Sequence, residues 1–220
     1  MKILNIGGGE IWNGFKTVLE RQGHTTVSYD DKNGCDVRNL RELSTTILDN
    51  KDADWLIYTA GVSHVQLIKE SKPEDIREEL EVNYLGFHYT AKFATEAGIK
   101  NFIVIISVAG LYGKPNHSGY SASKMALRSL VESLSREGYN AYGISPGRVD
   151  TPMREHDYPG EDVRTRLSTK QVANVVKEIM NGKHQSGDNV IIRKRGFRVL
   201  RRVDRNEMWK KYLNIGQVKQ

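Results

Sequence analysis

Short apolar runs rich in β-branched residues alternate along the chain with longer segments whose apolar residues recur every three to four positions. The short runs are typical of buried strands and the longer segments of amphipathic helices. Strands are expected at 2–6, 25–30, 54–60, 101–107, 140–145 and 189–193. Helices are expected from the first glycines to residue 22, at 38–49, 75–97 and 121–136, and from about residue 168. This alternation predicts an α/β fold, a doubly wound parallel sheet with helices on both faces.

One connection is too short for a complete Rossmann fold. Only the five residues DKNGC lie between Asp30 and Asp36, where such a fold usually carries another helix and strand. We therefore expect the third strand to be missing or reduced. Because no linker, repeat or low-complexity stretch interrupts the pattern, residues 1–200 are expected to form a single nucleotide-binding domain. Residues 201–220 are expected to form a basic C-terminal tail.

The net charge of +6 is concentrated near the C-terminus. Between Arg193 and Lys211, about nine Lys and Arg residues stand against Asp204 and Glu207. Such a cluster can contact nucleic acid, an acidic partner or a phosphorylated substrate, or it can simply be solvated. Because aromatic residues for base stacking are sparse there, we do not expect nucleic acid as a partner.

The apolar runs and the cysteine content of the chain indicate its cellular compartment. No stretch approaches the roughly 18 consecutive apolar residues of a membrane span, and the N-terminus lacks the pattern of a signal peptide. Cys35 is the only cysteine, which excludes an internal disulfide and favours the cytoplasm. We therefore expect a cytoplasmic protein without membrane contact, and we expect no metal site.

A glycine-rich turn, GGGEIWNG, follows the first expected strand and opens a helix. Glycines there let the backbone approach a pyrophosphate, and the helix N-terminus favours its negative charge. The second expected strand ends at Asp30, whose carboxylate can accept hydrogen bonds from ribose hydroxyls and would repel a 2′-phosphate. This favours NAD(H), although Lys32 leaves NADP(H) open. The alternative is that Asp30 only forms a turn.

Six short stretches in order resemble the short-chain dehydrogenase/reductase family: CDVRN, YTAGV, VNYLG, ISVAG, YSASK and SPGRVDT. The resemblance implies an NAD(P)-dependent oxidoreductase of carbonyl and alcohol groups, with catalytic residues Asn83, Ser107, Tyr120 and Lys124. It implies cofactor contacts from Asp36, Val37, Ala60, Gly61, Lys124, Pro146, Gly147, Val149 and Thr151. It also implies a homodimer or homotetramer.

The first loop departs from the family pattern Thr-Gly-x-x-x-Gly-x-Gly. Counting from Gly8, Trp12 stands where the second glycine is expected, and only Gly14 falls in register. We still expect cofactor binding by this loop, through Gly7, Gly8, Gly9, Ile11 and Trp12. Tyr58 and Thr59 replace the two asparagines of the family's next turn, so the hydrogen bonds of that turn must differ.

The spacing of Tyr120 and Lys124 suits proton transfer. Four-residue spacing on a helix places both side chains on one face, and a nearby ammonium lowers the pKa of a phenol. Ser107, at a strand end, could hydrogen-bond the substrate oxygen. By resemblance, Lys124 also reaches the nicotinamide ribose and Asn83 completes a proton relay through water. The alternatives are a chance surface pair, a strand-end cap at Ser107, and a buried, backbone-binding Asn83.

The segment 152–167, PMREHDYPGEDVRTRL, is short and polar and carries Arg154, His156, Arg164 and Arg166. Because it offers little apolar surface, we expect a small polar or anionic carbonyl or alcohol substrate. One alternative is a nucleotide-sugar epimerase or dehydratase, although the chain leaves no room for the larger C-terminal domain of those relatives. The other is a non-catalytic protein that senses dinucleotides or binds nucleic acid, which the irregular glycine loop and basic tail favour.

Overall fold

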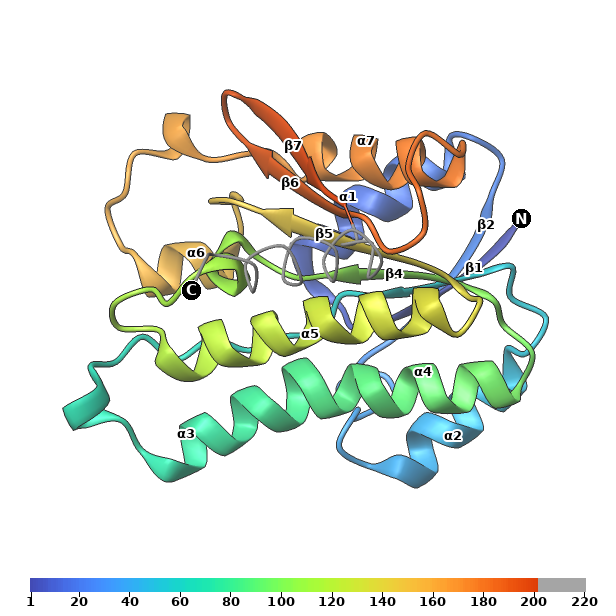
Figure 1. Cartoon of the computed structure of the whole chain (residues 1–220), viewed down its shortest axis with the longest axis horizontal. Coiled ribbons are helices and arrows are strands. Elements are labelled where there is room, and N and C mark those ends of the chain that lie inside the picture. The colour runs from blue at the N-terminus through green and yellow to red at the C-terminus, as the bar shows by residue number, and fades with distance from the viewer. Residues whose placement is uncertain (202–220) are drawn as a thin grey trace, which may run out of the picture.

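A seven-stranded sheet with the order β2-β1-β3-β4-β5-β6-β7 runs through the part of the chain, residues 1–201, that the computed structural model describes (Figure 1). The strands are β1 (Lys2–Ile6), β2 (Thr25–Tyr29), β3 (Trp55–Tyr58), β4 (Asn101–Ile105), β5 (Asn140–Pro146), β6 (Asn189–Arg193) and β7 (Gly196–Leu200). Neighbours from β2 to β6 are parallel, and β7 is antiparallel to β6. The predicted Rossmann-like sheet is confirmed, whereas the basic tail lies outside the described residues from position 202 onward.

The predicted loss of the third strand is confirmed, since β2 forms the edge of the sheet beside β1. Asp30 turns the chain at this point. Its Oδ1 accepts hydrogen bonds from the backbone N–H groups of Lys32 at 3.0 Å and Asn33 at 3.1 Å. Asn33 Oδ1 in turn accepts from the Asp30 N–H at 2.5 Å. These reciprocal bonds close a tight turn, so the chain proceeds directly to the next helix.

Helices cover both faces of the sheet (Figure 1). On one face, α1 (Gly9–Glu20) and α7 (Thr169–Met180) bury apolar residues against the strands. On the other face lie α2 (Leu40–Asp49), α4 (Gly86–Glu96) and α5 (Ser118–Arg136). Successive residues of each strand point to opposite faces, so Ile103 joins the first core and Phe102 the second.

Two helical segments differ from the sequence expectation. The helix expected at 75–97 is α3 (Pro73–Glu78) followed by a π-helix (Glu79–Leu85) and then α4. The helix expected at 121–136 begins three residues earlier, at Ser118. Shorter segments are α6 (Pro152–Asp157) and 3-10 turns at Ile68–Glu70, Val108–Leu111 and Val163–Thr165. No helix within residues 1–201 is long and apolar enough to cross a membrane.

Strand β7 is the one strand of the described sheet that the sequence pattern does not predict. It follows β6 through a two-residue turn, with Arg193 paired to Gly196, which has a φ of 138°. Its first three residues are exposed and Phe197 retains 64% of its surface. An exposed edge strand lacks the apolar alternation by which half-buried strands are recognised.

Candidate active site

A cavity of about 610 Å³ opens at the carboxyl ends of the parallel strands, the edge where ligands bind in such sheets. Ser107, Tyr120 and Lys124 line it together. Of the residues expected to hold a cofactor, those that also line it are Ile11, Gly61, Pro146, Gly147, Val149 and Thr151. Residues predicted from five separate stretches of sequence therefore meet at one cavity.

Tyr120 and Lys124 project from the same face of α5, as their spacing predicts. The Lys124 Nζ lies 5.6 Å from the centre of the Tyr120 ring. The same nitrogen donates a hydrogen bond to the Ile105 carbonyl oxygen at 3.1 Å, and the lysine is 3% exposed. Lys124 is therefore buried in the cavity wall beside a half-buried Tyr120, which contradicts the alternative of a chance surface pair.

Burial acts on both groups against their charged forms. It raises the pKa of Tyr120 to about 12, although the hydrogen bond with Ser107 opposes the shift. It lowers the pKa of Lys124 to about 7. The expected lowering of the Tyr120 pKa by a lysine ammonium is thus not found in the chain alone. Desolvation is the largest cause of the raised Tyr120 pKa, and the charges of Asp157 and Glu79 raise it further.

Ser107 follows β4 and has two roles. Its Oγ accepts a hydrogen bond from the Ala109 N–H at 3.1 Å and so caps the 3-10 turn Val108–Leu111. It also hydrogen-bonds the Tyr120 side chain, the interaction that lowers the pKa of that phenol. Strand-end capping and substrate binding, the two interpretations open from the sequence, are therefore compatible, because capping fixes the hydroxyl beside Tyr120.

Asn83 is fully buried in the π-helix and does not line the cavity. Its Oδ1 accepts from the Val62 N–H at 2.8 Å, while its Nδ2 donates to the Val62 carbonyl and to Ser123 Oγ, both at 3.0 Å. A methyl group at Gly61 would lie 3.2 Å from both Asn83 Oδ1 and Lys124 Nζ. The side chain of Asn83 therefore holds the turn that packs against Lys124. This agrees with the alternative that Asn83 is a buried residue that binds the backbone.

The glycine loop fits a dinucleotide phosphate. Gly7 has a φ of 114°, and a Cβ there would overlap the backbone of Thr59 and Ala60. Gly8 caps α1 without any side-chain hydrogen bond to the first turn, and Gly9 opens the helix with free space around it. The N–H groups at the start of this 12-residue helix therefore have no side-chain cap at Gly8, and the helix dipole favours an anion there.

The remaining expected cofactor residues lie beyond the cavity lining. The Asp30 carboxylate lies against Gly8, which places it beside the glycine loop. The side chains of Trp12 and Val37 pack in the two cores, with 4% and 5% of their surface exposed, so their backbones are what they can offer a ligand. Asp36 is paired with Arg38 at 2.8 Å, which lowers the pKa of the Asp36 carboxyl.

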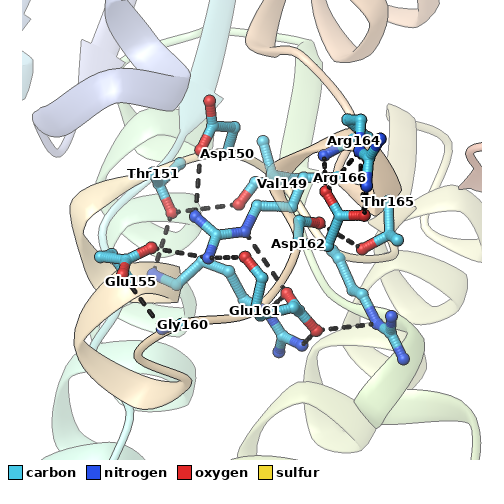
Figure 2. Close-up of polar contacts among 12 residues, drawn as sticks. Val149, Asp150, Thr151, Glu155, Gly160, Glu161, Asp162, Arg164, Thr165 and Arg166 are labelled. Atoms are coloured by element: carbon cyan, nitrogen blue, oxygen red, sulfur yellow. Dashed lines mark hydrogen bonds and ion pairs between the residues drawn. The ribbon is translucent and has the colours of Figure 1, made fainter.

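The arginines of segment 152–167 are engaged with carboxylates of their own neighbourhood, as Figure 2 shows. The Arg166 side chain is 2% exposed and contacts Asp150 at 3.1 Å and Glu155 at 2.6 Å, with Glu161 at 3.4 Å. Glu161 also binds Arg154 at 2.5 Å, which lowers the pKa of the Glu161 carboxyl. Arg154 and Arg166 are therefore not unpaired cations of the segment. Instead they fasten α6 and the loop after it to the end of β5.

Arg164 and His156 are likewise engaged away from the cavity. Arg164 pairs with Asp162 at 3.0 Å, and 89% of its side chain is exposed. His156 lies 3.4 Å from Asp157 and is 87% exposed. Of the four basic residues named in this segment, Arg154 lines the cavity and is paired with Glu161.

Sequence reasoning missed one cluster in the cavity wall. Lys114, in the loop before α5, donates a hydrogen bond to the Tyr158 hydroxyl at 2.6 Å. That hydroxyl lies 3.1 Å from His117 Nε2, and the His117 ring is 6.1 Å from that of Tyr120. All four residues line the cavity. Lys114 and Tyr158 are 44 positions apart, and no local pattern links them.

Comparison with known proteins agrees with this geometry. The family model for short chain dehydrogenases matches residues 23–162. A mouse 3-oxoacyl-[acyl-carrier-protein] reductase is 29% identical over 133 residues, which are 56% of this chain and 56% of that protein. The human reductase of the same name is 26% identical over 176 residues, 72% of this chain and 74% of the relative. The match to the mouse reductase therefore spans little more than half of its length.

Among solved structures, a short chain dehydrogenase from Burkholderia cenocepacia, in complex with NADP, superposes with a TM-score of 0.74. It is 21% identical, and the superposition covers 86% of each chain, which shows that the fold is shared. The family model covers more than half of the chain, and the residues it spans include Ser107, Tyr120 and Lys124 of the cavity. The chain belongs to the short chain dehydrogenase family.

Proposed function

We propose that this chain is an oxidoreductase that interconverts a carbonyl and an alcohol with a nicotinamide dinucleotide. The observation that carries the proposal is the hydrogen-bonded pair Ser107 and Tyr120 on one cavity wall, with Lys124 one helical turn away. The family match and the relatives named as reductases support it. When bound, the dinucleotide supplies or accepts a hydride.

The side chains of the site then stabilise the negative charge on the substrate oxygen and donate a proton to it. The Ser107 hydroxyl and the Tyr120 phenol donate hydrogen bonds to the carbonyl oxygen, where negative charge grows during reduction. With its pKa raised to about 12, Tyr120 is protonated at neutral pH and serves as the proton donor. Lys124, whose pKa is lowered to about 7, changes charge in the working range and can stabilise the phenolate that remains. Asn83 acts as a positioning residue through the turn at Val62.

Asp30 supports NAD(H) as the cofactor. Its carboxylate lies against Gly8, where it can accept hydrogen bonds from a ribose and would repel a 2′-phosphate. The Burkholderia cenocepacia neighbour is described in complex with NADP, so NADP(H) is the alternative for this chain. The two are separated by the ratio of their dissociation constants, and tighter binding of NADPH would remove the role given to Asp30.

Tyr120→Phe tests the chemistry. Loss of the proton donor should lower kcat by about 10²–10⁴-fold while the dissociation constant of the reduced dinucleotide stays within about threefold. Tyr112→Phe is the matched control, because Tyr112 lines the same cavity but is 50% exposed. Equal turnover by Tyr120→Phe and the unmutated chain would contradict the proposal. Stoichiometric consumption of the reduced dinucleotide separates this activity from an epimerase, which returns the hydride and consumes none.

A further inference from the structure

Lys114 belongs to a directed chain of hydrogen bonds in the cavity wall. His117 Nδ1 lies 3.1 Å from the Pro115 carbonyl oxygen, which can only accept, so this nitrogen carries the ring proton. Burial lowers the pKa of His117, so the ring is neutral and its Nε2 is an acceptor. Tyr158 therefore donates its hydroxyl proton to Nε2 at 3.1 Å and accepts from Lys114 Nζ at 2.6 Å.

This chain holds Lys114 in one place. The Tyr158 ring stacks on His117 with centroids 5.8 Å apart and an interplanar angle of 7°. Arg154 covers the Tyr158 ring at 3.7 Å, and Lys114 Nζ itself lies 4.6 Å from the centre of that ring. One of the three ammonium protons of Lys114 is used by Tyr158, which leaves two donors for a ligand.

Lys114 has no ion-pair partner in the described part of the chain. Within residues 1–201 it has no carboxylate within 4.0 Å, whereas Arg154 and Arg166 are paired with Glu161. Two carboxylates share the cavity lining, Glu161 and Asp157. Glu161 faces three arginines, while Asp157 contacts only His156 among the described basic residues. The carboxylate of Asp157 would therefore repel an incoming anion.

Further cations of the lining lie elsewhere. Arg193 ends β6 beside Gly147, one of the expected cofactor residues, and Lys194 follows it. Lys194 Nζ donates to the Arg166 carbonyl at 2.8 Å. Lys114, in contrast, reaches the cavity from the loop between Ser107 and Tyr120, next to the residues that would hold the substrate oxygen.

We propose that Lys114 binds a carboxylate of the substrate, so that the compound reduced or oxidised at Tyr120 is a small oxo acid or its hydroxy acid. This inference rests on the proposed function and names its substrate class. An ammonium held by Tyr158 gives a carboxylate two charge-assisted hydrogen bonds, and the neutral His117 adds no competing charge. The carbonyl group of the same molecule then lies at Ser107 and Tyr120.

The test is a binding measurement that does not depend on turnover. Acetoacetate and levulinate, each beside its methyl ester, are titrated into the full chain with oxidised dinucleotide present, and binding is followed by ligand-observed NMR. The acids should bind more tightly than their esters. Lys114→Gln should weaken acid binding by about tenfold to a hundredfold, because charged hydrogen bonds are lost, and should leave ester binding within about threefold. Lys114→Arg should restore part of the preference.

Two further variants fix the interpretation. Asp157→Asn should tighten acid binding severalfold, because it removes the unneutralised carboxylate of the cavity. Lys69→Gln removes an equal charge from an exposed side chain outside the cavity lining and should leave acid binding unchanged. Equal binding of acids and esters by the unmutated chain, or equal weakening of both by Lys114→Gln, would overturn the inference.

Turnover of the same compounds separates this inference from the proposed function. If the acids bind through Lys114 but no dinucleotide is consumed with any of them, the anion site stands and the oxidoreductase proposal fails for these compounds. If acids and esters are reduced with equal kcat/KM in both the unmutated chain and Lys114→Gln, the oxidoreductase stands and the carboxylate site is refuted.

Discussion

Replacing Lys124 by methionine should make the protein more stable at low pH, because Lys124 is a buried cation with no carboxylate partner among the described residues. Its pKa falls from the ordinary 10.5 to about 7. Below pH 7 the folded chain therefore bears the full cost of a buried ammonium, about 5 kcal/mol for a shift of this size. The lost hydrogen bond to the Ile105 carbonyl offsets about 1–3 kcal/mol of that gain. The unfolding free energy of Lys124→Met should thus exceed that of the unmutated chain by about 2–4 kcal/mol at pH 6.

The pH dependence gives the sharper result. Between pH 7 and 10.5 the unfolded chain binds a proton at Lys124 that the folded chain has released, so the stability of the unmutated chain rises with pH relative to the variant. From the two pKa values, the difference in unfolding free energy should close by about 3 kcal/mol between pH 6 and pH 9. Urea unfolding at both pH values measures it, with the exposed Lys16→Met as a control. Parallel stability curves for Lys124→Met and the unmutated chain would refute the reasoning.

Two further changes probe the walls of the site. The Tyr58 hydroxyl donates to a π-helix carbonyl at 2.6 Å in a fully buried setting, so Tyr58→Phe should cost about 1–3 kcal/mol in urea unfolding. Tyr142→Phe, on a buried ring whose hydroxyl bonds no described residue, should cost under about 0.5 kcal/mol, and equal costs would contradict the account. In the glycine loop, Gly9→Ala should cost about 1–2 kcal/mol, because its φ is 82° and the space around it is open. Gly7→Ala should cost more and weaken dinucleotide binding, since its Cβ would overlap Ala60; equal effects on melting temperature would contradict this.

The sheet and the central site could be predicted from sequence because their signals are local. Each buried parallel strand is a continuous apolar run, and a short turn between Asp30 and Asp36 leaves no room for a third strand. Tyr120 and Lys124 share a helical face by spacing alone. The strand end at Ser107 reaches the same edge because all parallel strands end there.

What the sequence could not supply depends on packing between distant segments. Desolvation sets the pKa of Lys124 and Tyr120, and burial is a property of the whole fold. Arg166 pairs with Asp150 and Glu155 only because the loop after α6 folds back. The sequence shows the charge of Arg166 but not these ion pairs. The pairing of Lys114 with Tyr158 spans two loops, and neither loop has a periodic pattern that reveals it.

The most direct test of the account is a fluorescence titration of the full chain with NADH and with NADPH. The account predicts saturable binding of NADH, tighter than that of NADPH, because the Asp30 carboxylate lies against Gly8 beside the open N-terminus of α1. Saturable binding of NADPH alone would overturn the role of Asp30 and leave the chemistry at Tyr120 standing. The absence of binding by either dinucleotide would contradict the central claim that this cavity performs hydride chemistry.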